Sequence, residues 1–380
     1  MPIVDNKIER FEFHEYEPAA RLNLNGAGEI RINVEQQDLF TLPSEAYLLF
    51  EGQLVKLDGT AYANTDVVTL TNNGITHLFS QISYQLSNQD IETVYHPDTA
   101  TTALLAHNSG FVLRQAYIIQ KSATKETFSF CIPLRHIFGF SDDYDKVIYG
   151  FKHTITLIRK SDYDAIFKLA AAALGKVYLN KISLFIPHVI PSDVERIILY
   201  RSIELKVTLP VSFRARQCDT KTILQSTTFS WRLSVKTSPK KPRYIIVAFQ
   251  TSKDGDQNAN ASTFDHCNLK NMYIMLNQER YPAVDYNLSL PNQQFSRAHR
   301  DAAVFNEKFY GMNELITHSN ITPSDYRDLY PLSVLDVSKQ SERLKSSAID
   351  VQIKATFNTV VPADTEAIAF VISERMIEFQ

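Results

Sequence analysis

The sequence has 380 residues, of which 44% are apolar and 21% charged, and this length predicts two domains rather than one hydrophobic core. A net charge of −3 argues against a chain that binds nucleic acid directly, because such chains are strongly basic. Three widely spaced cysteines (Cys131, Cys218 and Cys267) argue against a disulfide framework and favour a reducing compartment.

The first 27 residues are predicted to form an N-terminal arm. They are polar, are interrupted by Pro2 and Pro18, and show little hydrophobic periodicity. They lack the basic and apolar regions of a secretory signal, and the whole chain lacks an apolar run of about 18 residues that would predict a membrane span.

From Gly28 the pattern is typical of β-strands. Ile30, Ile32 and Val34 alternate with polar residues, which is the period of a half-buried strand. A hairpin is expected over 80–96, with its turn at Ser87-Asn88-Gln89. Further strands are expected in 46–59, 66–74, 116–120, 127–134, 146–159 and 176–187.

Two helices are predicted near the middle of the chain. The first spans 160–175, with Ser161 as its N-cap and Gly175 as its stop. The second follows Ser192, which forms a capping box with Glu195. Its apolar residues Val194, Ile197 and Ile198 share one face, so we expect this helix to pack on a sheet and to connect two domains.

The second half repeats the β pattern. Strands are expected in 229–237, 243–251, 271–277, 349–360 and 366–379, with one short helix beginning at Ser324. Two halves rich in short strands predict an all-β protein built from two sandwiches or jelly rolls. The predicted organisation is an arm (1–27), a first β domain (28–191), a helical connector (192–205) and a second β domain (206–380).

Catalytic and cofactor-binding motifs are missing from the sequence. It has no Gly-x-Ser-x-Gly, no phosphate-binding loop, no His-Glu-x-x-His and no Cys-x-x-Cys. We therefore predict no catalytic, cofactor-binding or metal-binding residues.

Four short stretches contain residue types that such sites use. Residues 254–265 resemble a calcium loop, but Ala259 stands where glycine is needed, so a polar surface loop fits better. The acids of 141–145 suit either acid/base chemistry or a solvated loop tip, and we favour the loop tip. His266-Cys267 is interpreted as a pair without metal, and the basic stretch 238–243 as a solvated loop.

Several blocks, taken in order, resemble the major capsid proteins of double jelly-roll DNA viruses, most closely the Polinton/Maverick, adintovirus and Polinton-like virus group. The resemblance covers residues 28–380. Its blocks are "HLFSQISYQLSNQDIE", "IPLRHIFGF", "LIRKSDYDAIF" and "VYLNKISLFIPHVIPS" in the first half, and "PRYIIVAFQT", "NASTFDHCNLKNMYIMLNQERYP", "YPLSVLDVSKQSE" and "VPADTEAIAFVISERMIEF" in the second.

The resemblance implies a structural protein without catalytic residues, made of two tandem jelly rolls with a few short helices. Three copies would form a pseudo-hexagonal capsomer, and capsomers would tile an icosahedral shell around double-stranded DNA without sequence-specific binding. Penton and minor capsid proteins are expected as partners, the virion as the location, and an internal membrane is left open. The alternative is a carbohydrate-binding or glycan-hydrolysing β-sandwich protein.

Two features would then contribute to contacts. The loops 251–268 and 291–322 are too long for simple connections and are predicted to be inter-subunit or exterior elements. In the stretch 276–288, Arg280, Tyr281 and Asp285 are predicted either to fix a turn or to contact another subunit.

Overall fold

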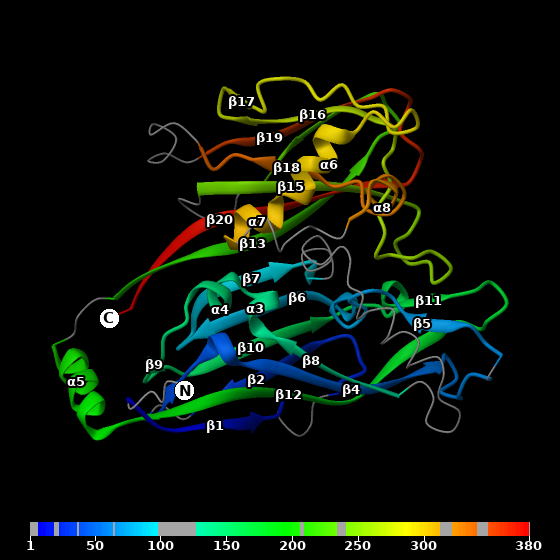
Figure 1. Cartoon of the computed structure of the whole chain (residues 1–380). Helices are drawn as coiled ribbons and strands as arrows, with labels where there is room; N and C mark the ends of the chain where they lie inside the picture. The colour runs from blue at the N-terminus through cyan, green and yellow to red at the C-terminus, as the bar shows by residue number, and fades with distance from the viewer. Residues whose placement is uncertain are drawn as a thin grey trace.

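The computed structural model describes residues 7–18, 23–35, 38–63, 65–97, 127–205, 209–233, 241–311, 321–339 and 349–379. The predicted strand at 116–120 and part of the basic stretch 238–243 lie outside these residues. The described strands pair in antiparallel sheets, which confirms the all-β prediction. In Figure 1 the sheets of the two halves lie side by side, and the helix α5 stands at one end of the molecule.

The first half contains two large sheets that enclose one core. Buried side chains such as Ile32, Leu48 and Leu157 fill the space between them. One sheet has the order β8 (Thr127–Pro133), β4 (Tyr47–Lys56), β12 (Gly175–Pro191), β3 (Phe40–Thr41) and β9 (Ile148–Tyr149), with β1 (Ile8–Tyr16) also paired to β12. The other has the order β2 (Glu29–Val34), β10 (His153–Arg159), β6 (Phe79–Leu86) and β7 (Gln89–Tyr95), and a small third sheet pairs β11 (Ile166–Lys168) with β5 (Val68–Leu70). Short helices lie at Pro43–Glu45 (η1), Thr76–Leu78 (η2), Leu134–Ile137 (α3), Gly139–Asp143 (α4) and Tyr163–Ala165 (η3).

The second half repeats this arrangement with two four-stranded sheets. One has the order β13 (Leu209–Ile223), β20 (Thr365–Phe379), β15 (Lys241–Thr251) and β18 (Ser333–Asp336). The other has the order β14 (Thr228–Arg232), β19 (Val351–Phe357), β16 (Leu269–Leu276) and β17 (Glu279–Tyr281). Helices α6 (Ser296–Ala303), α7 (Phe305–Tyr310) and α8 (Pro323–Asp328) complete this half. No described helix of the chain is long and apolar enough to cross a membrane.

Two local predictions are confirmed. The hairpin β6–β7 turns at Ser87 and Asn88, which both have positive φ as tight hairpin turns require. Helix α8 lies where a helix was expected from Ser324. Its N-cap is Thr322, whose side chain accepts a hydrogen bond from the Asp325 amide at 3.1 Å.

The predicted helix over 160–175 is wrong. Only the single turn η3 forms there, and Ile166–Lys168 then extends as β11 against β5. Ile166 is fully buried in this position, so tertiary packing overrides the local helix propensity. Gly175 begins strand β12 instead of ending a helix.

The second predicted helix exists as α5 (Asp193–Glu204), but its expected packing is wrong. Val194, Ile197 and Ile198 are 69%, 56% and 52% exposed, so among the described residues this face is not packed on a sheet. Ser192 is the N-cap residue, yet its side chain makes no capping hydrogen bond. The helix instead contacts the first half through Tyr200, whose ring lies 5.5 Å from that of Tyr149.

The N-terminal region also differs from the expected arm without periodicity. Residues 8–16 form strand β1, which pairs along β12 from Leu184 to Pro191. This pairing gives the main chain of the segment hydrogen-bond partners, although most of its side chains are exposed.

Candidate functional site

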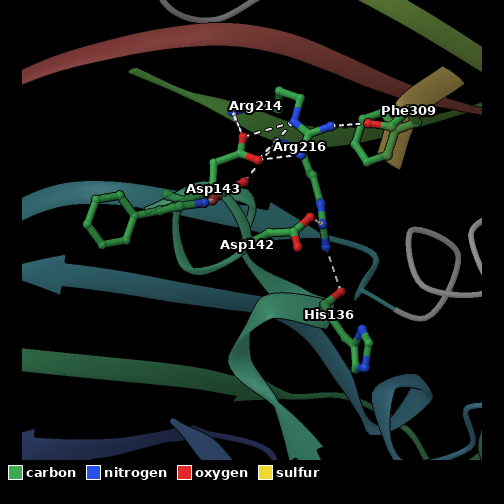
Figure 2. Close-up of polar contacts among 8 residues, drawn as sticks. His136, Asp142, Asp143, Arg214, Arg216 and Phe309 are labelled. Carbon is green, nitrogen blue, oxygen red and sulfur yellow. Dashed lines mark hydrogen bonds and ion pairs between the residues drawn. The ribbon is translucent and has the colours of Figure 1, made fainter. Parts of the chain in front are cut away.

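The most elaborate polar arrangement in the described residues joins the two halves. Arg214 and Arg216 lie two residues apart on β13, so both side chains leave the same face of the strand. Across from them, α4 carries Asp142 and Asp143 (Figure 2). We call these four residues together with Glu92 the junction cluster.

Arg216 is the buried member of the junction cluster. Its side chain is 1% exposed, and its guanidinium donates to an Asp142 carboxylate oxygen at 2.8 Å and to the His136 carbonyl oxygen at 2.8 Å. Figure 2 shows the side chain reaching from β13 down to the turn between α3 and α4. An ion pair this shielded from water is costly to break from one side only.

Arg214 is less buried and binds several groups at once. Its Nε donates to Asp143 at 2.9 Å, the backbone N–H of Arg214 donates to the same carboxylate at 2.6 Å, and the guanidinium lies over the Phe309 ring at 4.1 Å. Burial disfavours the charged guanidinium, but the hydrogen bond and charge of Asp143 outweigh burial and raise the pKa of Arg214. The arginine therefore stays charged.

Glu92 ties the cluster to the backbone on both sides. It is 2% exposed, and its two carboxylate oxygens accept hydrogen bonds from the backbone N–H of Arg216 at 2.7 Å and the backbone N–H of Phe140 at 3.0 Å. One carboxylate from β7 thus holds a strand of the second half and a helix of the first half.

The backbones of the two halves touch directly beside this cluster. A Cβ on Gly139 would lie 1.8 Å from the carbonyl oxygen of Arg214, closer than any side chain allows. Glycine is therefore required here by the close approach of α4 to β13.

Nearby, burial and the charge of Arg216 lower the pKa of His136. The imidazole is therefore neutral at physiological pH, which suits its position beside a buried cation. Each carboxylate of the junction cluster accepts hydrogen bonds from the second half, so the cluster ties the two halves together as a rigid joint.

These contacts correct the interpretation of 141–145. The stretch is neither an acid/base pair nor a solvated loop tip, because Ser141 is 1% exposed and both Asp142 and Asp143 pair with arginines of the other half.

The loop 251–268 makes a second joint. Gln257 is fully buried, donates to the Gly175 carbonyl oxygen at 2.7 Å and accepts from the Gly175 N–H at 2.9 Å. Its own carbonyl accepts from the Lys168 N–H at 2.8 Å, and Asp164 accepts from the Gly255 N–H at 2.8 Å. The side-chain amide of Gln257 thus pairs with the backbone of Gly175 as a residue of a neighbouring strand would.

This placement corrects two expectations for the loop. Part of it is buried between the halves of one chain, so it is neither a polar surface loop nor simply an exterior or inter-subunit element. Its acidic and amide groups do not converge as calcium ligands would: Asp256 accepts from the Asn258 N–H at 2.9 Å, and Asn260 accepts from Ser262 at 2.7 Å. In the described residues no three metal-ligating His, Cys, Asp or Glu side chains gather.

In the stretch 276–288, the structure brings Arg280 and Asp285 together as an ion pair. Asp285 also accepts from Asn271 at 2.7 Å, and the Arg280 guanidinium stacks over the Tyr273 ring at 4.0 Å. Tyr281, which precedes a cis peptide bond to Pro282, donates to Glu279 at 2.8 Å. These contacts fix the turn after β17 within one chain.

The pair His266-Cys267 has separate local roles. His266 Nδ1 accepts from the Asn268 N–H at 2.8 Å, whereas burial raises the pKa of the Cys267 thiol to about 11. A thiol with this pKa is protonated at neutral pH and is a poor nucleophile or metal ligand.

The sequence did not identify four residues that connect the two halves: Glu92, Arg214, Arg216 and Gln257. In "VSFRARQ" the two arginines alternate with Val211, Phe213 and Ala215, so the strand period predicts the arginines on the solvent face. The sequence therefore carries no local signal that Arg216 is buried and paired with an acid of 141–145.

Comparison with known proteins agrees with this architecture. The double jelly roll-like domain family matches residues 68–377. The fold is similar to that of the Faustovirus major capsid protein, with a TM-score of 0.61 and 8% identity over 98% of this chain and 90% of the other. It is also similar to PBCV-1 VP54, fitted into a reconstruction of the virophage Sputnik (TM-score 0.60, 11% identity, 98% and 95% covered), and to the mavirus major capsid protein (TM-score 0.52, 10% identity, 97% and 90% covered). No curated protein gave a significant match. The predicted fold of two jelly rolls with few short helices is confirmed.

Proposed function

The chain belongs to the double jelly roll-like domain family, and from this premise we propose that it is a viral major capsid protein. Its role is structural: three copies form a pseudo-hexagonal capsomer, and capsomers build an icosahedral shell around double-stranded DNA. We further propose that the chain belongs to the Polinton/Maverick, adintovirus and Polinton-like virus group, on the resemblance of the sequence blocks described above. Penton and minor capsid proteins would be further partners, and the virion its location.

The observation that carries this proposal is the exposed apolar surface outside two well-packed halves. On β1, Phe11 and Phe13 are 42% and 46% exposed, and Val194 on α5 and the C-cap residue Leu205 are 69% and 75% exposed. A single exposed apolar residue is ordinary, but groups on one strand and one helix favour contact with another protein surface. Further copies of the chain would supply that surface in a shell.

The joints between the halves support the same role. A capsomer needs two jelly rolls held at a fixed relative position, and the buried pair of Arg216 with Asp142 provides such rigidity. With a net charge of −3 the subunit does not condense DNA by phosphate neutralisation, so we propose that it encloses DNA without specific binding.

The glycan-hydrolysing alternative loses its candidate carboxylates. Asp142 and Asp143 are engaged by arginines, and the 254–265 loop is engaged between the halves. We therefore propose no catalytic role and no cofactor.

Negative-stain imaging of the purified chain tests the proposal. We expect particles with three-fold symmetry and a hexagonal outline, whereas particles of single-chain size at micromolar concentration would contradict it. The double variant Ile197→Asp, Ile198→Asp asks whether α5 takes part: loss of three-fold particles from a folded protein assigns α5 to a contact between copies. If the three-fold particles of this variant stay intact, the contact between copies is made by surfaces other than α5.

A further inference from the structure

Strand β1 is attached to the first half through two stacked histidines. The imidazoles of His14 on β1 and His188 on β12 lie parallel, with centroids 3.9 Å apart and planes 12° apart. Other side chains of β1 also contact the first half: Glu15 pairs with Lys181 at 2.6 Å, and the Phe13 ring lies 5.6 Å from that of Tyr47. The histidine stack is therefore one of several side-chain attachments beyond the backbone pairing.

His188 is enclosed on the side away from His14. Its side chain is buried, and its Nε2 is 3.0 Å from the Tyr16 hydroxyl. In register it pairs with Glu12 on β1 and with Thr41 on β3.

A second buried imidazole lies behind this pair. Thr41 donates to the Ile148 carbonyl at 3.2 Å, so its oxygen accepts from His153 Nε2 at 2.9 Å. Nδ1 of His153 then accepts from the Tyr84 hydroxyl at 2.7 Å. Both ring nitrogens of the neutral imidazole are engaged, and a second proton on Nδ1 would require the Tyr84 hydroxyl to change from donor to acceptor.

We propose that β1 is an acid-released strap: the His14–His188 stack holds residues 8–16 on the first half at neutral pH, and protonation of the stack frees them. Two neutral imidazoles stack favourably, whereas two imidazolium rings at this separation repel each other. The proposal is independent of whether the chain forms capsids.

Several charged groups surround the stack. Glu12 lies 3.9 Å from His14 and itself pairs with Arg10. At His188, a charge on His14 opposes protonation and the Glu12 carboxylate favours it, but both effects are smaller than that of burial. The other ionisable neighbours, Tyr16 on β1 and His153 on β10, offer no negative charge at neutral pH. On α5, Glu195 lies 3.9 Å from Lys7, the residue before β1.

The direction of the pH effect follows from the released state. Burial, with a smaller contribution from His14, lowers the pKa of His188 to about 4, while a freed histidine has a pKa of about 6.5. The attachment is therefore at full strength above about pH 6.5 and weakens as the pH falls toward 4. At pH 5 this difference favours release by about 30-fold relative to neutral pH.

Hydrogen exchange of the full chain at pH 7.5 and pH 5.0, corrected for the intrinsic exchange rate, tests the strap. We expect protection of the amides in 9–15 to fall about 30-fold, while amides 155–157 of β10 keep theirs. In His188→Gln this fall should disappear, and in His14→Phe, which retains a stacked ring without a titrating group, it should shrink.

Three results would overturn the proposal. One is equal protection of residues 9–15 at both pH values, or no protection at pH 7.5. Another is an equal fall in β10, which would mean that acid unfolds the first half rather than releasing β1. The third is an unchanged pH response in His188→Gln.

Discussion

Replacing Arg216 by methionine removes the guanidinium of the buried member of the junction cluster while keeping an unbranched apolar stem. The change deletes the hydrogen bonds to Asp142 and to the His136 carbonyl, both at 2.8 Å. The backbone N–H that donates to Glu92 is retained, so the effect reports the guanidinium alone.

The magnitude follows from what is left behind. Asp142, whose side chain is only 16% exposed, loses its hydrogen-bonded cation and keeps only the more distant charge of Arg214. Removing one partner of a buried ion pair costs about 3–5 kcal/mol. Because the pair spans the two halves, the free energy of their association falls by this amount.

A matched control exists on the surface. Arg232 pairs with Asp350 at 2.6 Å, but its side chain is 73% exposed. The same substitution, Arg232→Met, is expected to cost under about 1 kcal/mol, because exposed pairs are weak. A double change, Arg216→Met with Asp142→Leu, should recover part of the loss, since no unpaired charge remains.

Urea denaturation followed by two probes measures the effect. The single tryptophan, Trp231, reports on the second half, and far-ultraviolet circular dichroism reports on both halves. In the wild type we expect coincident transitions, and in Arg216→Met an earlier and separated one. An Arg216→Met protein as stable as Arg232→Met, with transitions still coincident, would refute the reasoning.

Three further substitutions test the close approach at Gly139, the hydrogen bonds of Gln257 and the turn at Asp285. Gly139→Ala places a Cβ 1.8 Å from a backbone oxygen and should cost at least about 3 kcal/mol, whereas Gly28→Ala, with no atom within 4 Å, should be tolerated; equal melting temperatures would contradict this. Gln257→Leu removes two buried hydrogen bonds to the first half and should lower the free energy of unfolding in urea by about 2–3 kcal/mol. The stability of the wild-type protein should not change on addition of calcium or of a chelator, and a calcium-dependent stability would instead indicate a cation site in the loop 254–265. Asp285→Ala should cost about 1 kcal/mol without changing the particle mass, and loss of oligomers without loss of stability would instead assign Asp285 to a subunit contact.

Much of the strand content could be predicted because its signal is local. In "EIRINV" the side chains Ile30, Ile32 and Val34 alternate, and all three are buried in β2 as the period requires. The turn at Ser87 and Asn88 was predictable for the same reason, since turn chemistry is written in adjacent residues.

The joints depend on pairings that no local pattern specifies. Asp142 and Arg216 are 74 residues apart, and Gln257 and Gly175 are 82 apart. An acidic stretch following Phe138-Gly139-Phe140 has the composition of a loop tip whether or not an arginine pair of the other half faces it. The failed helix over 160–175 has the same origin, because pairing with β5 decides the conformation of Ile166–Lys168.

The solution mass of the purified chain tests the central claim most directly. Each chain has a mass of 43.3 kDa, so light scattering coupled to size exclusion should give a single species of three times that mass that persists on dilution to low micromolar concentration. A stable species of 43.3 kDa across the same range would contradict the assignment of the chain as a capsid subunit.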